Sequence, residues 1–553
     1  MLRLLCVTGG ILILAGGISA PHAPHVFGGS PPIQIASSSR EAESQAALEA
    51  GLLLEQQRLW SDGINHYESA VRKYPGNATL QQRLLICRLH YDVQRRYQDS
   101  TFLQSVGELS AQQALDLYAE VLANMETHYV DGVEWKRLVR HGSASLEVAL
   151  TEPLFIQRAL PNASPEAVEQ FRQTVHLQVV HRDVKSRHEL RAIAAQVAAS
   201  ARQELGLAAS ATVLEFVCGA INSLDPFSRF LTAGQLDETF SSIEGNFVGL
   251  GVELKAADDR LMILSVIPGG PAAEIGLQPG ESIVRVEDSL TAEVKPDFAA
   301  DLLRGPEGSF VSLSVTDIHG NARDLRVQRR RVEVPCVENV HIVDTEAGIG
   351  YLRLTNFQKT TTREVEKALW DLQSQGMRSL IIDVRGNPGG LLSAAVEVAD
   401  RFLPSGRIVT TRGRNARENF DYSAHRTNTW TMPLAVLIDS DSASASEIFA
   451  GAIRDHARGK LLGETSYGKG SVQGIFRMQS AKCGLCLTTA KFYSPSGQVI
   501  SERGVTPDIT VEPSYISARP NAKGEITRDI DDVVLQRAVQ TFRPESRLSS
   551  LPR

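Results

Sequence analysis

The sequence predicts a multidomain protein with a helical N-terminal region, a small β-rich domain and a C-terminal α/β core. Its 553 residues are enough for three or four domains at about 150 residues each. Helical periodicity gives way to short β-type runs near Glu244, and strand and helix signals alternate from about Glu333. These two changes of pattern separate the three parts.

The composition excludes two classes of protein. Hydrophobic residues make up 42% of the chain and charged residues 22%, which supplies several cores but too little apolar sequence for a multi-span membrane protein. The 57 basic and 64 acidic residues give a net charge of −7. Because nucleic-acid binding requires a basic field, no nucleic-acid partner is expected.

The first 20 residues have the pattern of an export signal. Arg3 is followed by apolar and small residues over 4–20, and no further charge occurs before position 40. A signal-peptidase cut after Ala20 or Ala23 would be followed by a proline, which is unfavourable there. The segment is therefore either a cleaved signal or a retained membrane anchor. Both readings place the protein outside the cytoplasm, in the periplasm or another extracytoplasmic space, and the second associates it with the inner membrane.

Residues 21–39 are rich in Pro, Gly, Ser and His and are predicted to be a linker. Residues 40–105 are predicted to be helical. Part of this region resembles one tetratricopeptide repeat of about 34 residues. The matching residues are Gly51, Trp60, Tyr67, Ala70 and Pro75. A single repeat cannot bury its own face, so we expect these helices to pack on a neighbouring unit, and they could also bind an adaptor protein.

Residues 106–235 show helical periodicity and are predicted to form the N-terminal part of the main globular body. Their histidines are scattered, without the i, i+4 spacing of a metal site. No functional site is assigned to this region.

Residues 243–328 resemble a PDZ domain. The resemblance rests on Gly249-Leu250-Gly251-Val252 and on the run Ile267-Pro-Gly-Gly-Pro-Ala-Ala273. Glycines allow successive backbone N–H groups to point at one ligand, here the terminal carboxylate of a peptide, while a strand edge pairs with the peptide. Gly249, Leu250, Gly251 and Val252 are therefore the predicted peptide-binding residues. Glu281 stands where related domains usually have Asp.

Three segments stand out in the α/β core, residues 333–514. They are Asp383-Val-Arg-Gly-Asn-Pro-Gly-Gly390, Asp441-Ser-Ala-Ser-Ala-Ser-Glu447 and Gly463-Glu-Thr-Ser-Tyr-Gly-Lys-Gly-Ser-Val-Gln473. Their order and spacing resemble the carboxyl-terminal processing proteases, also called tail-specific proteases. The resemblance covers about residues 107–515 and implies a crotonase/ClpP-like protease core with an inserted PDZ domain. Residues 515–553 fall outside it and are predicted to form a C-terminal helix and tail.

The resemblance implies a serine peptidase in which Ser444 is the nucleophile, Lys469 the general base and Gln473 the residue that orients the lysine. Local sequence agrees, because a strand ending at Asp439 leads to a helix beginning near Ala445 and so places Ser444 at a helix N-terminus. A lysine acts as a base only when neutral. Lowering its pKa from about 10.4 to about 7 costs roughly 4 to 5 kcal/mol, which requires burial.

The resemblance also implies an oxyanion hole made by two backbone N–H groups. One belongs to Gly389 or Gly390, with Gly390 slightly preferred, and the other to Ala445. No metal and no organic cofactor is implied. The expected substrates are proteins with unstructured C-termini.

Alternative readings of the core remain. The pair Asp455-His456 lies about 18 Å of helical rise beyond Ser444, too far for a conventional triad. Asp455 is therefore expected to be structural, and Arg385, Glu447 and Asp508 to serve packing or ion pairing. Outside this mechanism, the chain could be a catalytically silent PDZ and helical-repeat scaffold, or a crotonase-like acyl-transfer enzyme, which the PDZ-like segment disfavours.

Of the six cysteines, Cys483 and Cys486 form a lone CxxC. A second pair at metal-ligand spacing is missing, so a zinc site is not expected. A local disulfide and two packed thiols are both compatible with the spacing, and packed thiols are favoured.

Overall fold

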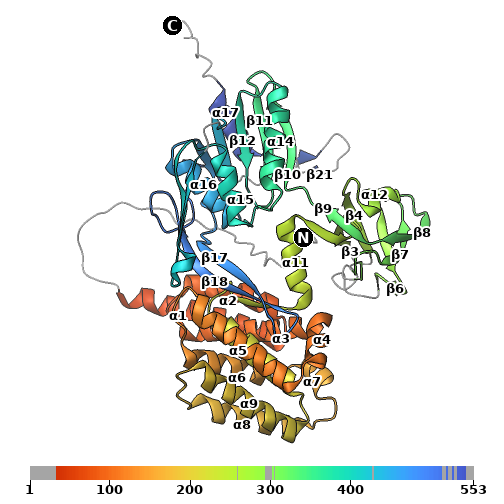
Figure 1. Cartoon of the computed structure of the whole chain (residues 1–553), viewed down its shortest axis with the longest axis vertical. Coiled ribbons are helices and arrows are strands. Elements are labelled where there is room, and N and C mark those ends of the chain that lie inside the picture. Colours follow the sequence, from red (N-terminus) through yellow and green to blue (C-terminus); the bar gives the residue numbers. More distant parts are fainter. Residues whose placement is uncertain are drawn as a thin grey trace.

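The computed structural model describes residues 33–257, 260–292, 302–303, 305–425, 429–512, 519–520, 526–527 and 532–543. It has three parts, with an α/β core at one end, a helical region at the other and a β domain projecting sideways between them (Figure 1). The predicted export segment lies outside the described residues. Within them, no helix is both long and apolar enough to cross a bilayer.

The helical region packs around one large hydrophobic core. Its helices are α1 (Ile33–Gln56), α2 (Trp60–Lys73), α3 (Ala78–Gln98), α4 (Ser100–Glu108), α5 (Ala111–His128), α6 (Trp135–Ala149), α7 (Pro153–Ala159), α8 (Pro165–Val180), α9 (Arg187–Leu205) and α10 (Ala209–Asn222). Helix α10 is central, because nearly all of its side chains are buried. It crosses α6 closely, and a Cβ on Gly219 would lie 2.3 Å from the carbonyl oxygen of His141.

The first three helices form a satellite on this region. Helix α1 begins at Ile33, so the helix starts inside the predicted 21–39 linker. Gly51 lies under the ring of Tyr67, where any side chain would collide with it. Arg58 forms an ion pair at 3.1 Å with the buried Glu152, which precedes α7. This contact attaches the three-helix satellite to the rest of the helical region. The tetratricopeptide assignment stays a prediction.

The β domain follows β1 (Arg229–Leu231) and α11 (Ala233–Glu244). Its elements are β2 (Asn246–Gly249), β3 (Val252–Ala257), β4 (Arg260–Val266), α12 (Pro271–Glu274), β5 (Ser282–Val286), β6 (Ser289–Leu290), β7 (Phe310–Thr316), β8 (Ala322–Gln328) and β9 (Arg330–Glu333). Strands β3-β4-β5-β7-β8 form the sheet, and β6 pairs with β5. Strands β2 and β9 form an antiparallel ribbon through which the chain enters and leaves the domain.

The α/β core is built on a sheet of order β10-β11-β12-β15-β16-β19, in which only β10 runs antiparallel. Its elements are β10 (Val337–Asp344), β11 (Ile349–Leu354), α14 (Thr361–Ser374), β12 (Ser379–Asp383), α15 (Leu392–Asp400), β15 (Leu434–Ile438), α16 (Ala445–Asp455), β16 (Lys460–Gly463), β19 (Ile509–Thr510) and α17 (Val533–Phe542). Helices α14, α15 and α16 cover one face and α17 the other. The carboxyl ends of β12 and β15 lead into the first two motifs.

A second sheet connects the core to the helical region. It contains β13 (Gly406–Gly413), β14 (Phe420–Ala424), β17 (Ser471–Arg477) and β18 (Gly484–Tyr493), with β1 paired to β18. The hairpin β17–β18 extends from the core down to the helices (Figure 1). Near its tip, Cys483, Leu485 and Leu487 are buried in the helical core. The hairpin therefore fixes the helical region against the third motif.

Candidate active site

Ser444 lies on the turn between β15 and α16, at the carboxyl end of the parallel sheet. Its backbone has φ 56° and ψ −112°, which is outside the regions that serine normally adopts. A strained conformation at this place turns one residue out of the strand-to-helix path, and such strain is typical of functional sites. Sequence reasoning placed Ser444 correctly at the helix start but could not predict the strain.

The two neighbouring serines are structural. Ser442 Oγ donates to the carbonyl of Val384 at 2.9 Å, and Ser446 Oγ donates to the carbonyl of Asn387 at 3.0 Å. Both hydroxyls are buried and tie this turn to the first motif. The Ser444 hydroxyl is partly exposed and donates no hydrogen bond within the described residues. Of the three serine hydroxyls in this motif, only that of Ser444 has a proton that is not used in a hydrogen bond within the described residues.

The glycine pair of the first motif lies directly against the Ser444 turn. Gly389 and Gly390 have φ values of 106° and 132°, which L side chains rarely adopt. A Cβ on Gly389 would lie 2.8 Å from Ser444 Cβ, and a Cβ on Gly390 would lie 2.1 Å from the carbonyl oxygen of Phe357. Glycine is therefore required at both positions by close approach as well as by conformation.

The hydrogen bonds separate these two glycines. The N–H of Gly389 donates to Asn387 Oδ1 at 2.9 Å and is not available to a ligand. Within the described chain, the N–H groups of Gly390 and Ala445 have no acceptor. Of the predicted oxyanion residues, Gly390 and Ala445 thus offer free donors beside Ser444, whereas Gly389 contributes close packing.

Glu447 joins the second motif to the third. Its fully buried carboxylate accepts hydrogen bonds from four groups. The donors are Ser444 N–H at 2.8 Å, Ser466 Oγ at 2.6 Å, Gly468 N–H at 2.7 Å and Lys469 N–H at 2.9 Å. Burial raises the pKa of Glu447, and these hydrogen bonds oppose the rise. Glu447 therefore positions the backbone of both proposed dyad residues, a role beyond the packing or ion pairing expected from the sequence.

Lys469 is half-buried, and its ammonium lies in front of an aromatic ring. Its Nζ is 5.0 Å from the ring centroid of Phe227. Burial lowers the pKa of the lysine below its usual value, and the charge of Arg229 acts in the same direction. Cys486, Glu447 and Asp225 oppose the shift. The environment therefore favours the neutral amine that a general base requires.

The side chains of the predicted dyad are not hydrogen-bonded to each other in this structure. Among the described residues, no hydrogen bond joins Lys469 Nζ to Ser444 Oγ. Gln473 Nε2 donates to Ser471 Oγ at 2.9 Å, and Gln473 makes no hydrogen bond to Lys469. The backbones of Ser444 and Lys469 are held together through Glu447, while the lysine side chain points toward Phe227.

Sequence reasoning missed residues 225–231, which form a wall beside the side chain of Lys469. Asp225 accepts from the N–H groups of Phe227 and Ser228 at 2.7 and 2.8 Å, which shapes the turn after α10. Ser228 Oγ then accepts from the N–H of Thr488 on β18 at 3.1 Å. An Asp-Pro turn after a helix was the only local signal, and it marks no function by itself.

Comparison with known proteins identifies the family. The sequence profile of Peptidase family S41 matches residues 348–511, and that of the PDZ domain matches residues 241–316. A carboxy-terminal-processing protease of Bartonella bacilliformis is 37% identical over 300 residues, which are 53% of this chain and 68% of that protein. The chain belongs to the carboxy-terminal-processing proteases of family S41.

A second relative agrees with this assignment. A carboxyl-terminal-processing protease of Synechocystis sp. is 34% identical over 53% of this chain and 69% of its own length. Among solved structures, the photosystem II D1 C-terminal processing protease is 25% identical, with a TM-score of 0.39 over 74% of this chain and 96% of that chain. The two profile matches and the observed helices confirm the predicted S41 peptidase fold with a PDZ domain and a helical N-terminal region.

The conventional-triad residues of this S41 peptidase have structural roles. His456 Nε2 lies 2.6 Å from the carbonyl oxygen of Arg407, away from Ser444. Asp455 Oδ2 accepts from the hydroxyls of Ser494 and Ser496 at 2.6 and 2.7 Å, which anchors the end of α16 as expected.

Two further motif residues also have structural roles. Arg385 forms an ion pair at 2.6 Å with both Asp383 and Asp532, and so holds α17 on the sheet. Asp508 Oδ2 accepts from the N–H of Leu461 at 2.8 Å.

The predicted PDZ ligand loop uses its carbonyls for structure. Leu250 and Gly251 accept from the N–H groups of Ala272 and Ile267, both at 2.8 Å. Within the described residues, the N–H groups of Leu250 and Gly251 have no acceptor. The Leu250 side chain is buried in the domain core, so the loop can offer its backbone to a ligand. Residues 293–301, which follow β6, lie outside the described residues.

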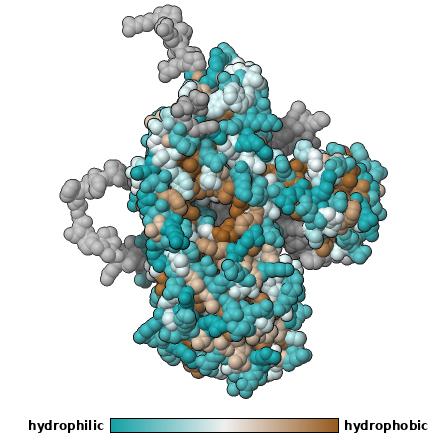
Figure 2. Space-filling view, in the orientation of Figure 1, coloured by the Kyte–Doolittle hydropathy of each residue, from teal (hydrophilic) through white to brown (hydrophobic). Residues whose placement is uncertain are grey.

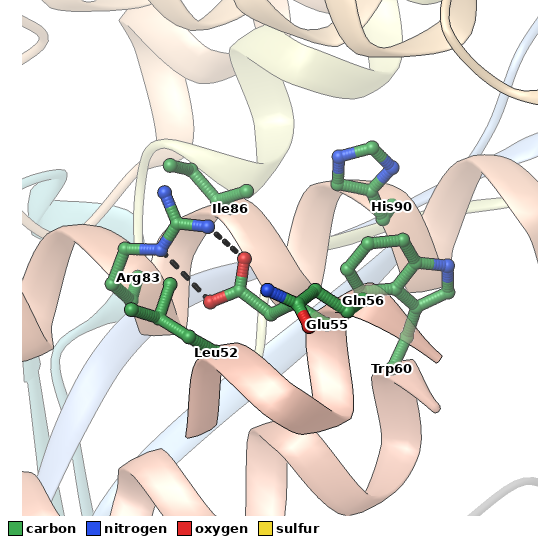
Figure 3. A pocket seen from close by; sticks show the side chains of 7 residues that line it. All are labelled: Leu52, Glu55, Gln56, Trp60, Arg83, Ile86 and His90. Atoms are coloured by element: carbon green, nitrogen blue, oxygen red, sulfur yellow. Dashed lines mark hydrogen bonds and ion pairs between the residues drawn. The ribbon is translucent and has the colours of Figure 1, made fainter. Parts of the chain in front are cut away.

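A separate pocket lies in the helical satellite, far from the motifs in sequence. Its lining residues are Leu52, Glu55, Gln56, Trp60, Arg83, Ile86 and His90. Figure 3 shows Glu55 paired with Arg83 and the ring of His90 stacked on Trp60, with centroids 4.1 Å apart. The described residues contain no group of three or more His, Cys, Asp or Glu side chains arranged for a metal ion. All five cysteines among them are free and buried, so Cys483 and Cys486 are packed thiols.

The role of Glu447 can be tested with Glu447→Gln. The amide keeps one acceptor but presents an NH₂ group to donors, so the Ser444 and Lys469 loops should shift apart. We expect kcat/KM to fall roughly 10²-fold, the scale of a misplacement of about 1 Å, with kcat changing more than KM. Glu346→Gln, at an exposed position, is the matched control. Unchanged peptide cleavage by Glu447→Gln would show that the carboxylate does not position the dyad.

Proposed function

We propose that the chain is an exported serine endopeptidase that binds unstructured C-terminal tails of proteins through its PDZ domain and cleaves them at Ser444. The main support is the hydroxyl of Ser444, which donates no hydrogen bond within the described residues. It lies on a strained turn beside the free N–H groups of Gly390 and Ala445. This combination provides a nucleophile and a place for negative charge at the same point.

In the proposed reaction, Ser444 Oγ attacks the carbonyl carbon of the peptide bond while neutral Lys469 accepts its proton. The N–H groups of Gly390 and Ala445 stabilise the oxyanion. The lysine ammonium then protonates the leaving amine, which releases the tail and leaves an acyl-enzyme on Ser444. Water deprotonated by Lys469 hydrolyses this ester. Asn387 keeps Gly389 turned so that Gly390 can face the oxyanion.

The mechanism requires Lys469 Nζ to move from the ring of Phe227 to Ser444 Oγ. Such hydrogen bonds are often formed only when substrate is present. Glu447 already fixes the backbones of Ser444 and Lys469, so the movement we propose is a rotation of the lysine side chain. In that conformation we assign to Gln473 the role of accepting a hydrogen bond from the lysine amine.

The absence of a hydrogen bond between Lys469 Nζ and Ser444 Oγ favours one alternative, a catalytically silent PDZ and helical-repeat scaffold. An active site with a competent serine reacts with a fluorophosphonate, whereas a silent scaffold does not. Labelling of the wild-type protein that disappears in Ser444→Ala would support the peptidase and reject the scaffold.

Export is proposed from the apolar residues 4–20. The mature protein would then act in the periplasm or another extracytoplasmic space, with membrane association if the segment is retained. The N-terminal helices are proposed as a binding site for an adaptor protein.

The nucleophile is tested by three alanine variants. Ser444→Ala should lower the cleavage rate at least ~10⁴-fold because it removes the covalent nucleophile. Ser442→Ala and Ser446→Ala should retain much of the activity and lose about 1 to 3 kcal/mol of unfolding free energy, since each removes buried hydrogen bonding of the serine hydroxyl. Peptide cleavage and urea denaturation measure the two effects. Robust cleavage by Ser444→Ala would reject the assignment.

The base is tested by Lys469→Arg. Arginine fills similar space but stays charged, so activity should fall nearly as far as in Lys469→Ala, while Lys460→Arg on β16 should behave as wild type. Because burial lowers the pKa of Lys469, the wild-type rate should rise with pH along one limb with its midpoint below the usual lysine pKa. An active arginine variant, or a rate that is flat from about pH 5 to 9, would contradict the dyad.

Tail recognition is tested with one unstructured peptide that has a free, an amidated or an Asp-extended C-terminus. Backbone N–H groups that bind a free carboxylate contribute about 1.5 to 3 kcal/mol, roughly 10- to 150-fold in affinity. We therefore expect the amidated and Asp-extended peptides to bind and be cleaved less well. Equal rates for all three peptides would reject recognition by the Leu250–Gly251 loop without affecting the Ser444 chemistry.

A further inference from the structure

Arg229 lies on the strand that brings the helical region to the cleft. Strand β1 pairs antiparallel with β18, so that Arg229 is directly opposite Cys486. On the other side of β18, Ile475 of β17 is also opposite Cys486. Residues directly opposite one another in antiparallel strands project from the same face of a sheet. Arg229, Cys486 and Ile475 therefore form one row across this face.

The same face borders Lys469. Cys486 Sγ lies 3.8 Å from the carbonyl oxygen of Phe227, and the ring of that phenylalanine lies 5.0 Å from Lys469 Nζ. Burial raises the pKa of the Cys486 thiol, while the positive charge of Arg229 opposes this rise. Arg229 therefore acts electrostatically on two groups of the cleft, the lysine amine and the cysteine thiol. In Figure 2, apolar residues gather around a hollow between the core and the helical region.

The guanidinium of Arg229 is exposed and has no carboxylate partner among the described residues. The acid nearest in sequence, Asp225, has other partners. Its Oδ1 accepts from two N–H groups of the turn, and its Oδ2 accepts from Ser228 Oγ at 2.8 Å. Arg477 on β17 differs from Arg229, because its guanidinium already has a partner: it stacks 4.1 Å from the ring centroid of Phe240. Arg229 is therefore an exposed cation near the lysine that forms no ion pair within the described residues, although the charges of Asp225 and Glu447 act on the same lysine.

We propose that Arg229 binds a carboxylate of the substrate next to the scissile peptide bond, so that the enzyme selects an acidic group at one position of the cleaved segment. The inference rests on the proposed cleavage at Ser444 and names a substrate feature for that site. A guanidinium has two parallel N–H donors that match a carboxylate, and an unpaired one gains most from such a ligand. The carboxylate belongs either to an Asp or Glu side chain or to the free C-terminus of a short tail.

This role is compatible with the chemistry of the base. A substrate carboxylate in the cleft would favour the protonated lysine if Lys469 were the nearest cation. When the carboxylate pairs with Arg229 the two charges cancel, so the contribution of Arg229 to the lowered pKa of Lys469 is lost, but burial of the lysine, the largest cause, remains. The amine can then stay neutral while an acidic substrate is bound.

The experiment uses the full-length protein and peptides in which Gln is replaced by Glu at single positions on each side of a mapped cleavage site. The wild type should prefer Glu roughly tenfold in kcat/KM at one position, the scale of one charge-assisted contact. Arg229→Gln should bring the Glu/Gln ratio near one, Arg229→Lys should restore part of it, and Arg229→Glu should reverse it. Arg202→Gln, an exposed arginine on α9, removes the same charge elsewhere and should leave the ratio unchanged.

Two further arms identify the source of the carboxylate and separate this proposal from the function itself. If the ligand is the free terminus, amidation of a short-tail peptide should abolish the difference between wild type and Arg229→Gln. Binding of the Glu and Gln peptides to Ser444→Ala, followed by fluorescence anisotropy, measures the preference without cleavage. The proposal would be overturned if Arg229→Gln changed neither the Glu/Gln ratio nor the effect of amidation on a short-tail peptide. Absence of any cleavage by the wild-type protein, with the binding preference intact, would overturn the peptidase function instead.

Discussion

The buried carboxylate of Glu447 holds the two halves of the proposed catalytic site together. It accepts one hydrogen bond from the nucleophile turn and three from the segment that ends at Lys469. A buried anion without a cation is costly, and only a full set of donors makes it tolerable. Each hydrogen bond to a charged group contributes about 1.5 to 3 kcal/mol, so four of them can offset the burial. The site thus depends on a charge that takes no direct part in the chemistry.

The negative charge of Glu447 acts against the proposed role of Lys469 as a general base. The negative charge of Glu447 raises the pKa of Lys469, whereas a general base needs it lowered. The structure opposes this effect with burial of the lysine in front of Phe227 and with the charge of Arg229. Both residues come from the turn and strand after α10, so the helical region provides what the core lacks.

Much of this arrangement could be predicted from sequence. The strand-to-helix turn at Ser444 and the glycine turn at 389–390 follow from local patterns, because each lies within a short stretch of sequence. The three-part architecture follows from the changes of periodicity near residues 244 and 333. The choice between Gly389 and Gly390 could not be settled, since it depends on a hydrogen bond that the Gly389 N–H donates to the side-chain oxygen of Asn387. The wall at 225–231 was missed because it is defined by contacts with β18, such as the Thr488–Ser228 bond across 260 residues of sequence.

The position of that wall changes how the helical region should be viewed. The S41 profile begins at residue 348, and the PDZ profile occupies 241–316, so residues 225–231 lie outside both. Yet β1 pairs with β18, and the tip of the β17–β18 hairpin is buried in the helical core. The apolar surroundings of Lys469 therefore exist only when the helical region is docked on the hairpin. A lysine base requires such surroundings, so in the proposed mechanism the helical region takes part in catalysis and is not an appended module.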